Sequence, residues 1–162
     1  MDRRIFLAGA GALVLAGCAG PGPQARLAPG TTLYVVRHGE KDGDALTKAG
    51  VARAEALALA LAEAPIDRIY STSYARNRAT AAPVAAVQDL EIETVPDSRI
   101  AARILPGNEA RALLWVGNKG NIAPLWEALS LPGPAPLNYG DLAVVRADAS
   151  GVVTVEMRRF GK

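Results

Sequence analysis

The chain of 162 residues contains only one cysteine and one histidine. A single cysteine excludes an internal disulfide, and one cysteine with one histidine excludes a zinc site built from the ordinary Cys and His ligands. The sequence also lacks a dense acidic loop of the kind that binds Mg²⁺ or Ca²⁺. These absences predict a protein without a resident metal ion, and nothing in the sequence indicates another cofactor.

A strong excess of charge is missing as well. The chain has 18 Lys and Arg against 16 Asp and Glu, a formal net charge of +2, which provides no basic surface for nucleic acid. Aromatic residues make up only 5% of the chain, while the hydrophobic share is 50% and rich in alanine. We therefore expect one domain in which helices pack closely on a sheet.

The N-terminal segment "MDRRIFLAGAGALVLAGC" has the layout of an export signal: a charged start, an apolar stretch and small residues before Cys18. Its apolar stretch is too short to span a membrane comfortably. Residues 15–18, "LAGC", resemble the bacterial lipobox, in which cleavage makes the cysteine the lipidated first residue. Residues 3–7, "RRIFL", partly resemble the twin-arginine export signal. We favour a cleaved lipoprotein signal over an uncleaved anchor, because the only cysteine stands at the required place.

These features predict three segments. Residues 1–17 form a signal peptide, residues 18–30 form the lipidated Cys18 with a flexible tether rich in Pro and Gly, and residues 31–162 form the functional domain. The expected location is the bacterial cell envelope, with the protein anchored to a membrane through its lipid and facing the periplasm or the exterior.

Strand-like and helix-like patterns alternate along the domain. Short β-branched or apolar runs predict strands at 31–36, 68–72, 92–95 and 112–116, and a closing hairpin at 142–147 and 152–159. Helical patterns cover 47–64, 73–87 and 121–129, with a kink or restart expected at Pro83. The pattern over 97–111 predicts no definite element. Such alternation favours a three-layer α/β/α sandwich with a mostly parallel sheet and a C-terminal β-hairpin.

Polar residues follow the predicted strands, and in open sheets of this kind ligands bind beyond the carboxyl ends of the strands. The first strand ends at "RHGE", residues 37–40, and the second is followed by Arg76 at the start of a helix. A later strand ends at "GNKG", which contains Asn118 and Lys119. Guanidinium groups match phosphoryl oxygens in geometry, so this set predicts a phosphate site. Any one of these residues alone would more often be an ordinary surface or structural residue.

The segments "VVRHGE", "LTKAGVARAEALALAL" and "YSTSYARNRATAAPVA", in this order and spacing, resemble the histidine phosphatase superfamily. That superfamily includes the cofactor-dependent phosphoglycerate mutases and the small bacterial phosphohistidine phosphatases. The resemblance extends from Leu33 to about Gly161. It implies a phosphoglycerate mutase-like fold, His38 as the nucleophile, and Arg37 and Arg76 as the residues that bind the phosphoryl oxygens. Positions Thr47, Gly50 and Thr80 match the motifs as mainly structural residues.

One part of the family pattern is missing. The family carries a second histidine in a segment like V-G-H-x-N-T-x-P, whereas this chain reads "WVGNKGNIAP". Depending on the alignment, Asn118 or Lys119 occupies the place of that histidine. We expect Lys119 to supply the missing positive charge, with Asn118 as a weaker hydrogen-bond donor, so both are predicted phosphate-binding residues.

Two questions stay open at the level of sequence. Glu40 is the nearest candidate for the general acid, and Asp42, Asp44 and Asp97 are alternatives. The favoured function is a metal-independent phosphatase that hydrolyses a phosphorylated small molecule or phosphoprotein through a phosphohistidine on His38. The alternative is a weakened or inactive relative, a lipoprotein that binds phosphorylated ligands without hydrolysing them.

Overall fold

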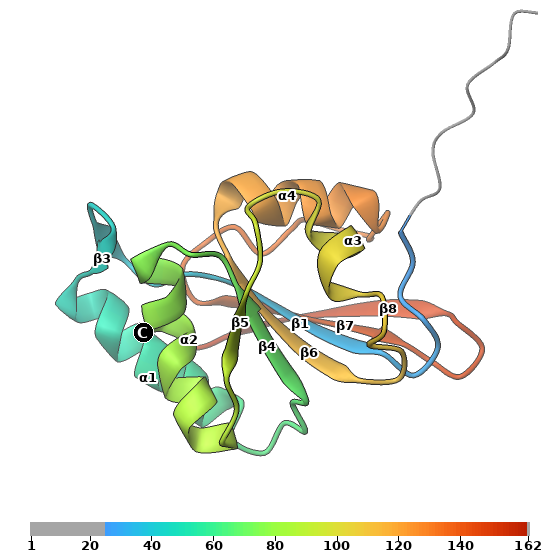
Figure 1. Cartoon of the computed structure of the whole chain (residues 1–162), viewed down its shortest axis with the longest axis horizontal. Helices are drawn as coiled ribbons and strands as arrows, with labels where there is room; N and C mark the ends of the chain where they lie inside the picture. The colour runs from blue at the N-terminus through green and yellow to red at the C-terminus, as the bar shows by residue number, and fades with distance from the viewer. Residues whose placement is uncertain (1–24, 162) are drawn as a thin grey trace, which may run out of the picture.

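The computed structural model describes residues 25–161, and one six-stranded sheet runs through the middle of the molecule (Figure 1). The strand order is β5-β4-β6-β1-β7-β8. In chain order these strands are β1 (Thr32–Arg37), β4 (Arg68–Ser71), β5 (Ile92–Thr94), β6 (Ala112–Gly117), β7 (Asp141–Ala147) and β8 (Val153–Arg159). The helices are α1 (Lys48–Ala60), α2 (Ala75–Gln88), α3 (Ile100–Ile104) and α4 (Lys119–Ala128).

The pairing confirms the predicted mixture of strand directions. Strands β5, β4, β6 and β1 run parallel to one another, whereas β7 pairs antiparallel with both β1 and β8. The last two strands therefore form the expected C-terminal hairpin. In the register between β1 and β6, Arg37 lies beside Gly117, so the loops that leave these two strands start at the same edge of the sheet.

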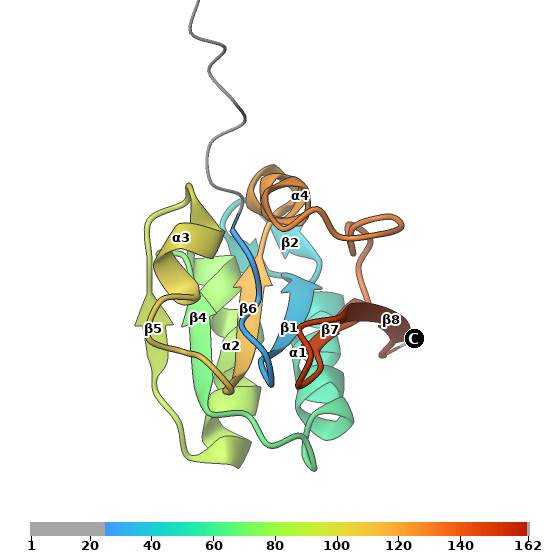
Figure 2. The ribbon, with the colours of Figure 1, turned by 90° about the vertical axis from the view of Figure 1, so that its right-hand side faces the viewer.

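Helices cover both faces of the sheet, as Figures 1 and 2 show. Successive side chains of β1 point to opposite faces, as the pleat of a strand requires. Leu33 and Val35 belong to the core cluster that includes residues of α3 and α4, and Tyr34 and Val36 belong to the cluster that includes residues of α1 and α2. Since the sheet is buried on both sides, the fold is the predicted three-layer α/β/α sandwich.

The helix boundaries differ from the sequence patterns for local reasons. Helix α1 ends at Ala60 rather than at residue 64, and the chain continues as turns up to Pro65, which disfavours a helical conformation at Ala64. Helix α2 runs through Pro83 without interruption. The carbonyl group that Pro83 leaves without a partner belongs to Ala79, which is exposed, so water can satisfy it.

Three further elements were not predicted or were placed differently. The polar loop after β1 contains a small hairpin of two strands, β2 (Lys41–Asp42) and β3 (Ala45–Leu46). Helix α3 lies inside the segment 97–111, for which the sequence indicated no definite element. Helix α4 begins at Lys119, two residues before the predicted start, so part of the "GNKG" loop belongs to its first turn.

The packed chain begins before the predicted domain boundary at residue 31. Leu27 is only 5% exposed and belongs to the core cluster beside α3 and α4. The Gly30 N–H donates a hydrogen bond of 2.9 Å to the Ala147 carbonyl, which ties this segment to the end of β7. The predicted signal peptide, the lipidation site Cys18 and the first part of the tether lie outside the described residues. Within 25–161, no helix has the length and apolarity needed to cross a membrane.

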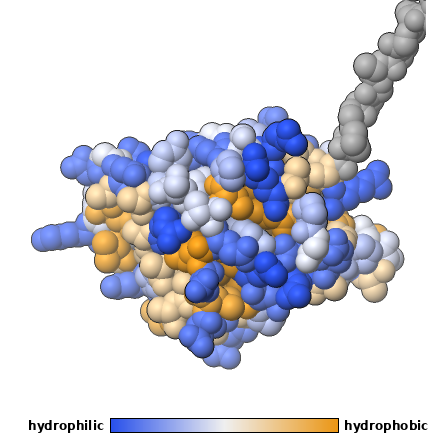
Figure 3. Space-filling view, in the orientation of Figure 1, coloured by the Kyte–Doolittle hydropathy of each residue, from blue (hydrophilic) through white to orange (hydrophobic). Residues whose placement is uncertain are grey.

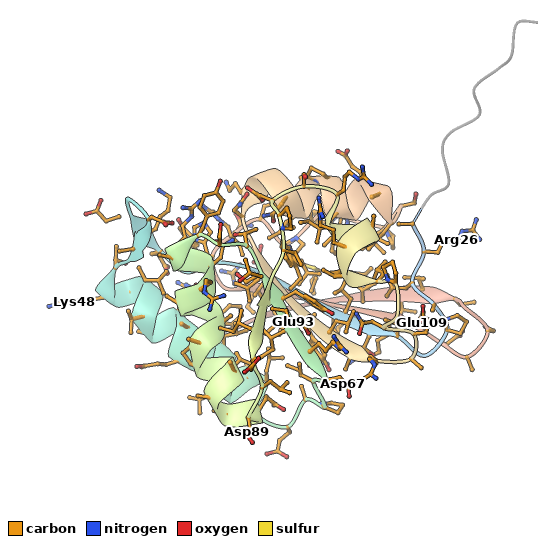
Figure 4. The ribbon with its side chains drawn as sticks, viewed as in Figure 1. Arg26, Lys48, Asp67, Asp89, Glu93 and Glu109 are labelled. Atoms are coloured by element: carbon orange, nitrogen blue, oxygen red, sulfur yellow. The ribbon has the colours of Figure 1, made fainter. Side chains whose placement is uncertain are left out.

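The predicted site lies at one of the two ends of the sheet. Lys48, labelled in Figure 4, marks the end at which α1 begins and the loop after β1 lies. Asp67 and Asp89, labelled in the same view, lie at the opposite end, before β4 and after α2. The residues of the predicted phosphate site lie at or after the carboxyl ends of β1, β4 and β6, so they belong to the end marked by Lys48.

Candidate active site

The single histidine lies directly after β1 and is held at two points. Its backbone N–H donates to the Gly117 carbonyl at 2.9 Å, which continues the pairing between β1 and β6 by one residue. Its side-chain Nδ1 lies 2.7 Å from the Gly39 carbonyl oxygen. A carbonyl oxygen only accepts, so Nδ1 carries the proton and Nε2 of the neutral ring keeps its lone pair. His38 is 2% exposed. Because the hydrogen bond of Nδ1 fixes the ring, Nε2 is the nitrogen that can act as a nucleophile.

The surroundings of His38 favour its neutral form. Burial lowers the pKa of His38 below its ordinary value of 6.5, because the charged ring would lose hydration. The Gly39 carbonyl acts in the opposite direction, whereas the positive charges of Arg37, Arg76 and Lys41 lower the pKa further. The two predicted arginines therefore act on the predicted nucleophile, and Lys41 on β2 joins them as a cation that sequence reasoning missed.

The loop after His38 packs tightly against the start of α1. A Cβ atom on Gly39 would lie 2.7 Å from the Gly50 carbonyl oxygen, and a Cβ on Gly50 would collide with the Glu40 carbonyl oxygen. The glycines therefore permit a contact that other residues would prevent. Thr47 caps α1 by accepting a hydrogen bond from the Gly50 N–H at 3.2 Å, as expected for a residue with a structural role.

Thr80 connects the histidine loop to α2. The Gly39 N–H donates to Thr80 Oγ1 at 2.9 Å, and the Thr80 hydroxyl donates to the Arg76 carbonyl oxygen at 2.8 Å. Thr80 is fully buried. This chain of two hydrogen bonds fixes the backbone of Arg76 relative to that of Gly39, which brings the two halves of the predicted site together.

The two arginines are oriented by different neighbours. Arg37 donates from Nη1 to the Leu137 carbonyl and from Nη2 to the Tyr139 hydroxyl, each at 3.1 Å. Arg76 donates from Nη1 to Asp44 at 2.5 Å. Each guanidinium also lies over an aromatic ring: the Cζ atom of Arg37 is 4.0 Å from the Tyr139 centroid, and that of Arg76 is 4.2 Å from the Tyr74 centroid.

Each arginine has one buried nitrogen donor without a partner. Among the described residues, Arg37 Nε and Arg76 Nε are buried and have no hydrogen-bond partner. Buried polar atoms nearly always find a partner, and leaving a charged donor without one is costly. Two such N–H groups, both belonging to residues whose charge acts on His38, are suited to bind the oxygen atoms of an anion.

The contacts of Glu40 do not favour its predicted role as a general acid. Arg53 on α1 donates from Nε to both carboxylate oxygens of Glu40 at 2.9 Å. Hydrogen bonding to Arg53 lowers the pKa of Glu40, which keeps the group ionised and without a proton to give. Arg53 also donates to the Phe160 carbonyl at 3.2 Å. Glu40 is therefore a structural residue that joins the histidine loop to α1.

We expect the substitution Glu40→Gln to lower the free energy of unfolding by about 1–3 kcal/mol, because Arg53 loses a charged acceptor. The measurement is denaturant unfolding. The control is Glu55→Gln, since Glu55 is an exposed residue on α1, the helix that carries Arg53. If Glu40 were the general acid, its substitution would change the pH dependence of the activity rather than the stability. Unchanged stability together with loss of the alkaline limb of the pH–rate profile would restore Glu40 to that role.

The residues in place of the second histidine are arranged at the start of α4. Asn118 is the N-cap residue, and its side chain donates to Asp97 at 3.4 Å. Asn121 also donates to Asp97, at 2.6 Å, so Asp97 is held beside the helix start. Lys119 is exposed and forms no hydrogen bond or ion pair with any residue of the described part. The structure thus does not hold the Lys119 amine in the site, and its role there stays a prediction.

Tyr139 is the main site residue that the sequence did not reveal. It lies in the loop before β7, and its ring centroid is 5.9 Å from that of His38. The late segment "YGDLAVV" contributes to the family resemblance, but no pattern within it distinguishes Tyr139 from a structural aromatic residue. Of the acidic alternatives, Asp44 accepts from the Ala75 N–H at 3.0 Å and pairs with Arg76. These hydrogen bonds lower the pKa of Asp44, so it too is ionised.

A groove separate from His38 lies between α3 and α4. It has a volume of about 530 Å³ and is lined by apolar residues such as Ile100, Pro124 and Leu125 together with the polar Asp97 and Asn121. Figure 3 shows apolar surface in this region. The groove does not include His38 or either arginine. Within residues 25–161, no cluster of three or more His, Cys, Asp or Glu side chains is arranged to hold a metal ion.

Sequence comparison connects this geometry to a family. Residues 33–99 match a family model described as "Histidine phosphatase superfamily (branch 1)", and this segment contains His38 and both arginines. An uncharacterized protein of Mycobacterium tuberculosis, Rv0525, is 38% identical over 88 residues. The match covers 48% of this chain and 44% of the relative, so the two are aligned over less than half of either chain.

Solved structures show the same fold over most of the chain. The protein histidine phosphatase SixA, complexed with tungstate, has a TM-score of 0.63 at 22% identity and covers 79% of this chain and 96% of that one. Bacillus stearothermophilus YhfR also has a TM-score of 0.63, at 17% identity and with the same coverage. A mycobacterial glucosyl-3-phosphoglycerate phosphatase, Rv2419c, gives 0.58 at 17% identity and covers 79% of this chain and 97% of its own. Over residues 33–99 the chain is thus similar to the histidine phosphatase superfamily, and over most of its length it has the same fold as these solved structures.

Proposed function

We propose that this protein is a metal-independent phosphatase that hydrolyses a phosphorylated small molecule or phosphoprotein through a phosphohistidine on His38. One observation carries the proposal. A neutral, oriented imidazole lies among two guanidinium groups that each keep one buried Nε–H donor without a partner. The arrangement suits a tetrahedral dianion, because two donors can bind its oxygen atoms while Nε2 faces the phosphorus.

The reaction needs two displacements. In the first, the lone pair of His38 Nε2 forms a bond to phosphorus, and the bond from phosphorus to the leaving group breaks with its electron pair going to the leaving group. In the second, water attacks the phosphohistidine and loses a proton. Inorganic phosphate leaves, and the electron pair of the N–P bond returns to Nε2. Arg37 and Arg76 stabilise the charge on the oxygen atoms in both steps.

The leaving group is restricted by the carboxylates of the site. Glu40 and Asp44 both have lowered pKa values because of their arginine partners and backbone hydrogen bonds, so neither is suited to donate a proton. A substrate whose leaving group needs little protonation, such as a phosphoramidate, a phosphohistidine or an acyl phosphate, avoids this requirement. We therefore propose substrates of this kind ahead of simple alkyl phosphates.

The test is hydrolysis of a phosphoramidate and of p-nitrophenyl phosphate by the chain from Ala19 onward, which keeps Leu27 in the core. We expect turnover that a chelator does not change, and faster turnover of the phosphoramidate. Loss of activity with chelator, restored by a divalent metal ion, would reject metal-independent catalysis. An absence of turnover with both substrates, with phosphate still raising the melting temperature, would support the binding alternative instead.

The lowered pKa of His38 predicts the acid limb of the activity. Attack needs the neutral ring, and burial together with the nearby cations lowers the pKa below 6.5. As pH falls, His38 therefore stays neutral and active to a lower pH than an ordinary histidine, and we expect the acid midpoint of kcat/KM below 6.5. Because the chain has one histidine, NMR titration of its imidazole measures the same group directly. A midpoint at or above 6.5 by both methods would contradict this arrangement.

One observation favours the second candidate, a lipoprotein that binds phosphorylated ligands with little or no turnover. The place of the second histidine is taken by Asn118, whose amide donates to Asp97, and by the exposed Lys119. Loss of one preorganised donor weakens transition-state stabilisation by about 3–4 kcal/mol if nothing replaces it. The arginines would still bind a phosphoryl group in that case.

We also propose that the protein is exported and anchored to a membrane of the bacterial envelope through a lipid on Cys18. The support is the sequence alone, namely the charged start, the short apolar stretch and the "LAGC" segment. Mass spectrometry of the membrane fraction tests it. A lipid-modified N-terminal Cys18 is expected, and Cys18→Ser is expected to leave the precursor uncleaved.

A further inference from the structure

The family's second histidine is missing from this site, and Tyr139 lies beside both His38 and Arg37. Its ring is tilted by 59° to the His38 ring at a centroid separation of 5.9 Å, and its hydroxyl contacts Arg37 Nη2 at 3.1 Å. Tyr139 is thus in contact with one phosphate-binding residue and beside the nucleophile. It comes from the loop before β7, a different part of the chain from "GNKG".

The hydrogen bonding of the Tyr139 hydroxyl leaves its own proton available. Arg37 has only donors, so in their hydrogen bond the tyrosine oxygen accepts. Among residues 25–161, no acceptor is bonded to the tyrosine O–H. An anion bound by Arg37 would therefore have the tyrosine O–H close by as a second donor. A phenol O–H can donate one hydrogen bond, as a neutral imidazole can.

We propose that Tyr139 takes the place of the absent histidine, with its hydroxyl donating a hydrogen bond to a phosphoryl oxygen held by Arg37. The proposal rests on the phosphatase function above. It makes Tyr139 a direct ligand of the phosphoryl group as well as the residue that orients Arg37. The hydrogen bonds to Leu137 and Tyr139 use one N–H of each terminal nitrogen of Arg37. Its buried, unpartnered Nε–H and the tyrosine O–H are two donors that remain for the ligand.

The loop that carries Tyr139 is fixed on several sides, as a preorganised donor requires. Gly140 has a φ of +81°, and a Cβ there would lie 2.6 Å from Arg53 Nη1 and 2.8 Å from the Phe160 carbonyl. The Gly140 carbonyl accepts from the Phe160 N–H at 2.9 Å. Arg159 donates to the Tyr139 carbonyl at 3.2 Å and to Asp141 at 2.6 Å. The ends of β7 and β8 therefore hold the tyrosine in position.

The decisive variant is Tyr139→Phe in the full chain, because it removes the hydroxyl and keeps the ring over Arg37. We expect kcat with a phosphoramidate to fall about 10- to 100-fold, and the affinity for orthovanadate to fall by a similar factor, since vanadate adopts the geometry of the transition state. The affinity for inorganic phosphate should fall less. The melting temperature of the variant without ligand should stay within about 2 °C of that of the parent chain. A hydroxyl with a purely structural role would instead lower the melting temperature when it is removed.

The control is Tyr34→Phe, which removes a hydroxyl from the same strand as Arg37 on the α1 and α2 side of the sheet. Activity of Tyr139→Phe within twofold of the parent, with unchanged vanadate affinity, overturns the proposal. If Lys119→Ala then lowers both quantities, the lysine is the replacement. If the parent chain itself neither turns over substrate nor binds vanadate or phosphate, the phosphatase proposal fails and the role of Tyr139 fails with it.

Discussion

Substitution of His38 by alanine is expected to lower turnover by at least about a thousandfold, because the only group able to form the covalent intermediate is removed. The chain has no second histidine that could take over. The binding donors of Arg37 and Arg76 remain, so the affinity for inorganic phosphate should change much less than kcat. Steady-state kinetics and calorimetric titration with phosphate measure the two quantities separately.

The covalent intermediate itself provides the control for this variant. Acid-quenched protein incubated with a phosphoramidate should carry an acid-labile, base-stable phosphoryl group in the parent chain and none in His38→Ala. Turnover that persists in His38→Ala at more than a tenth of the parent rate would exclude the phosphohistidine pathway. Loss of phosphate binding along with activity would mean that the imidazole also holds the site open, and would reject the separation of binding from chemistry.

The sequence placed the nucleophile and the two arginines that it predicted at one end of the sheet, because these residues follow a topological rule. His38 and Arg37 end one parallel strand, and Arg76 begins the helix after another. In a parallel sheet these positions meet at one edge. The structure brings their charges to the same place. Local patterns also gave the cap at Thr47, since capping depends on residues within one turn of the helix.

The parts that the sequence did not reveal depend on contacts between distant segments. Arg37 and Tyr139 are 102 positions apart, and only the register of β7 beside β1 brings them together. Glu40 was a reasonable general acid by proximity, but a side chain from α1 determines its charge state. The Arg53 guanidinium turns Glu40 into a structural anion, and no short motif indicates that pairing.

Short elements were missed for a different reason. Helix α3 has five residues, too few for a repeating apolar pattern, and the strands β2 and β3 have two residues each. Their stability comes from tertiary contacts rather than from local propensity. Even so, the β2–β3 hairpin influences the site, since it carries Lys41 on one side and leads through Asp44 to Arg76 on the other.

The substitution Arg76→Ala is expected to lower kcat/KM by about 100- to 1000-fold, the range found when one preorganised donor to a developing charge is removed. Arg76 is 16% exposed in its side chain, and its Nε is buried without a partner among the described residues. Removal of its charge should also raise the pKa of His38, because Arg76 is one of the cations that lower it. The acid midpoint of kcat/KM should therefore move to higher pH in this variant.

Two further variants separate charge from geometry at this position. Arg76→Lys keeps the positive charge but loses the planar fork of the guanidinium group. Its acid midpoint should therefore lie closer to that of the parent than the midpoint of Arg76→Ala does, while its kcat/KM stays well below the parent value. Arg78→Ala is the matched control, because Arg78 lies on the same helix, is exposed and donates to Thr94. It should leave both kcat/KM and the acid midpoint close to those of the parent. Equal losses in Arg76→Ala and Arg78→Ala would assign the effect to the overall charge of α2 and remove Arg76 from the phosphate site.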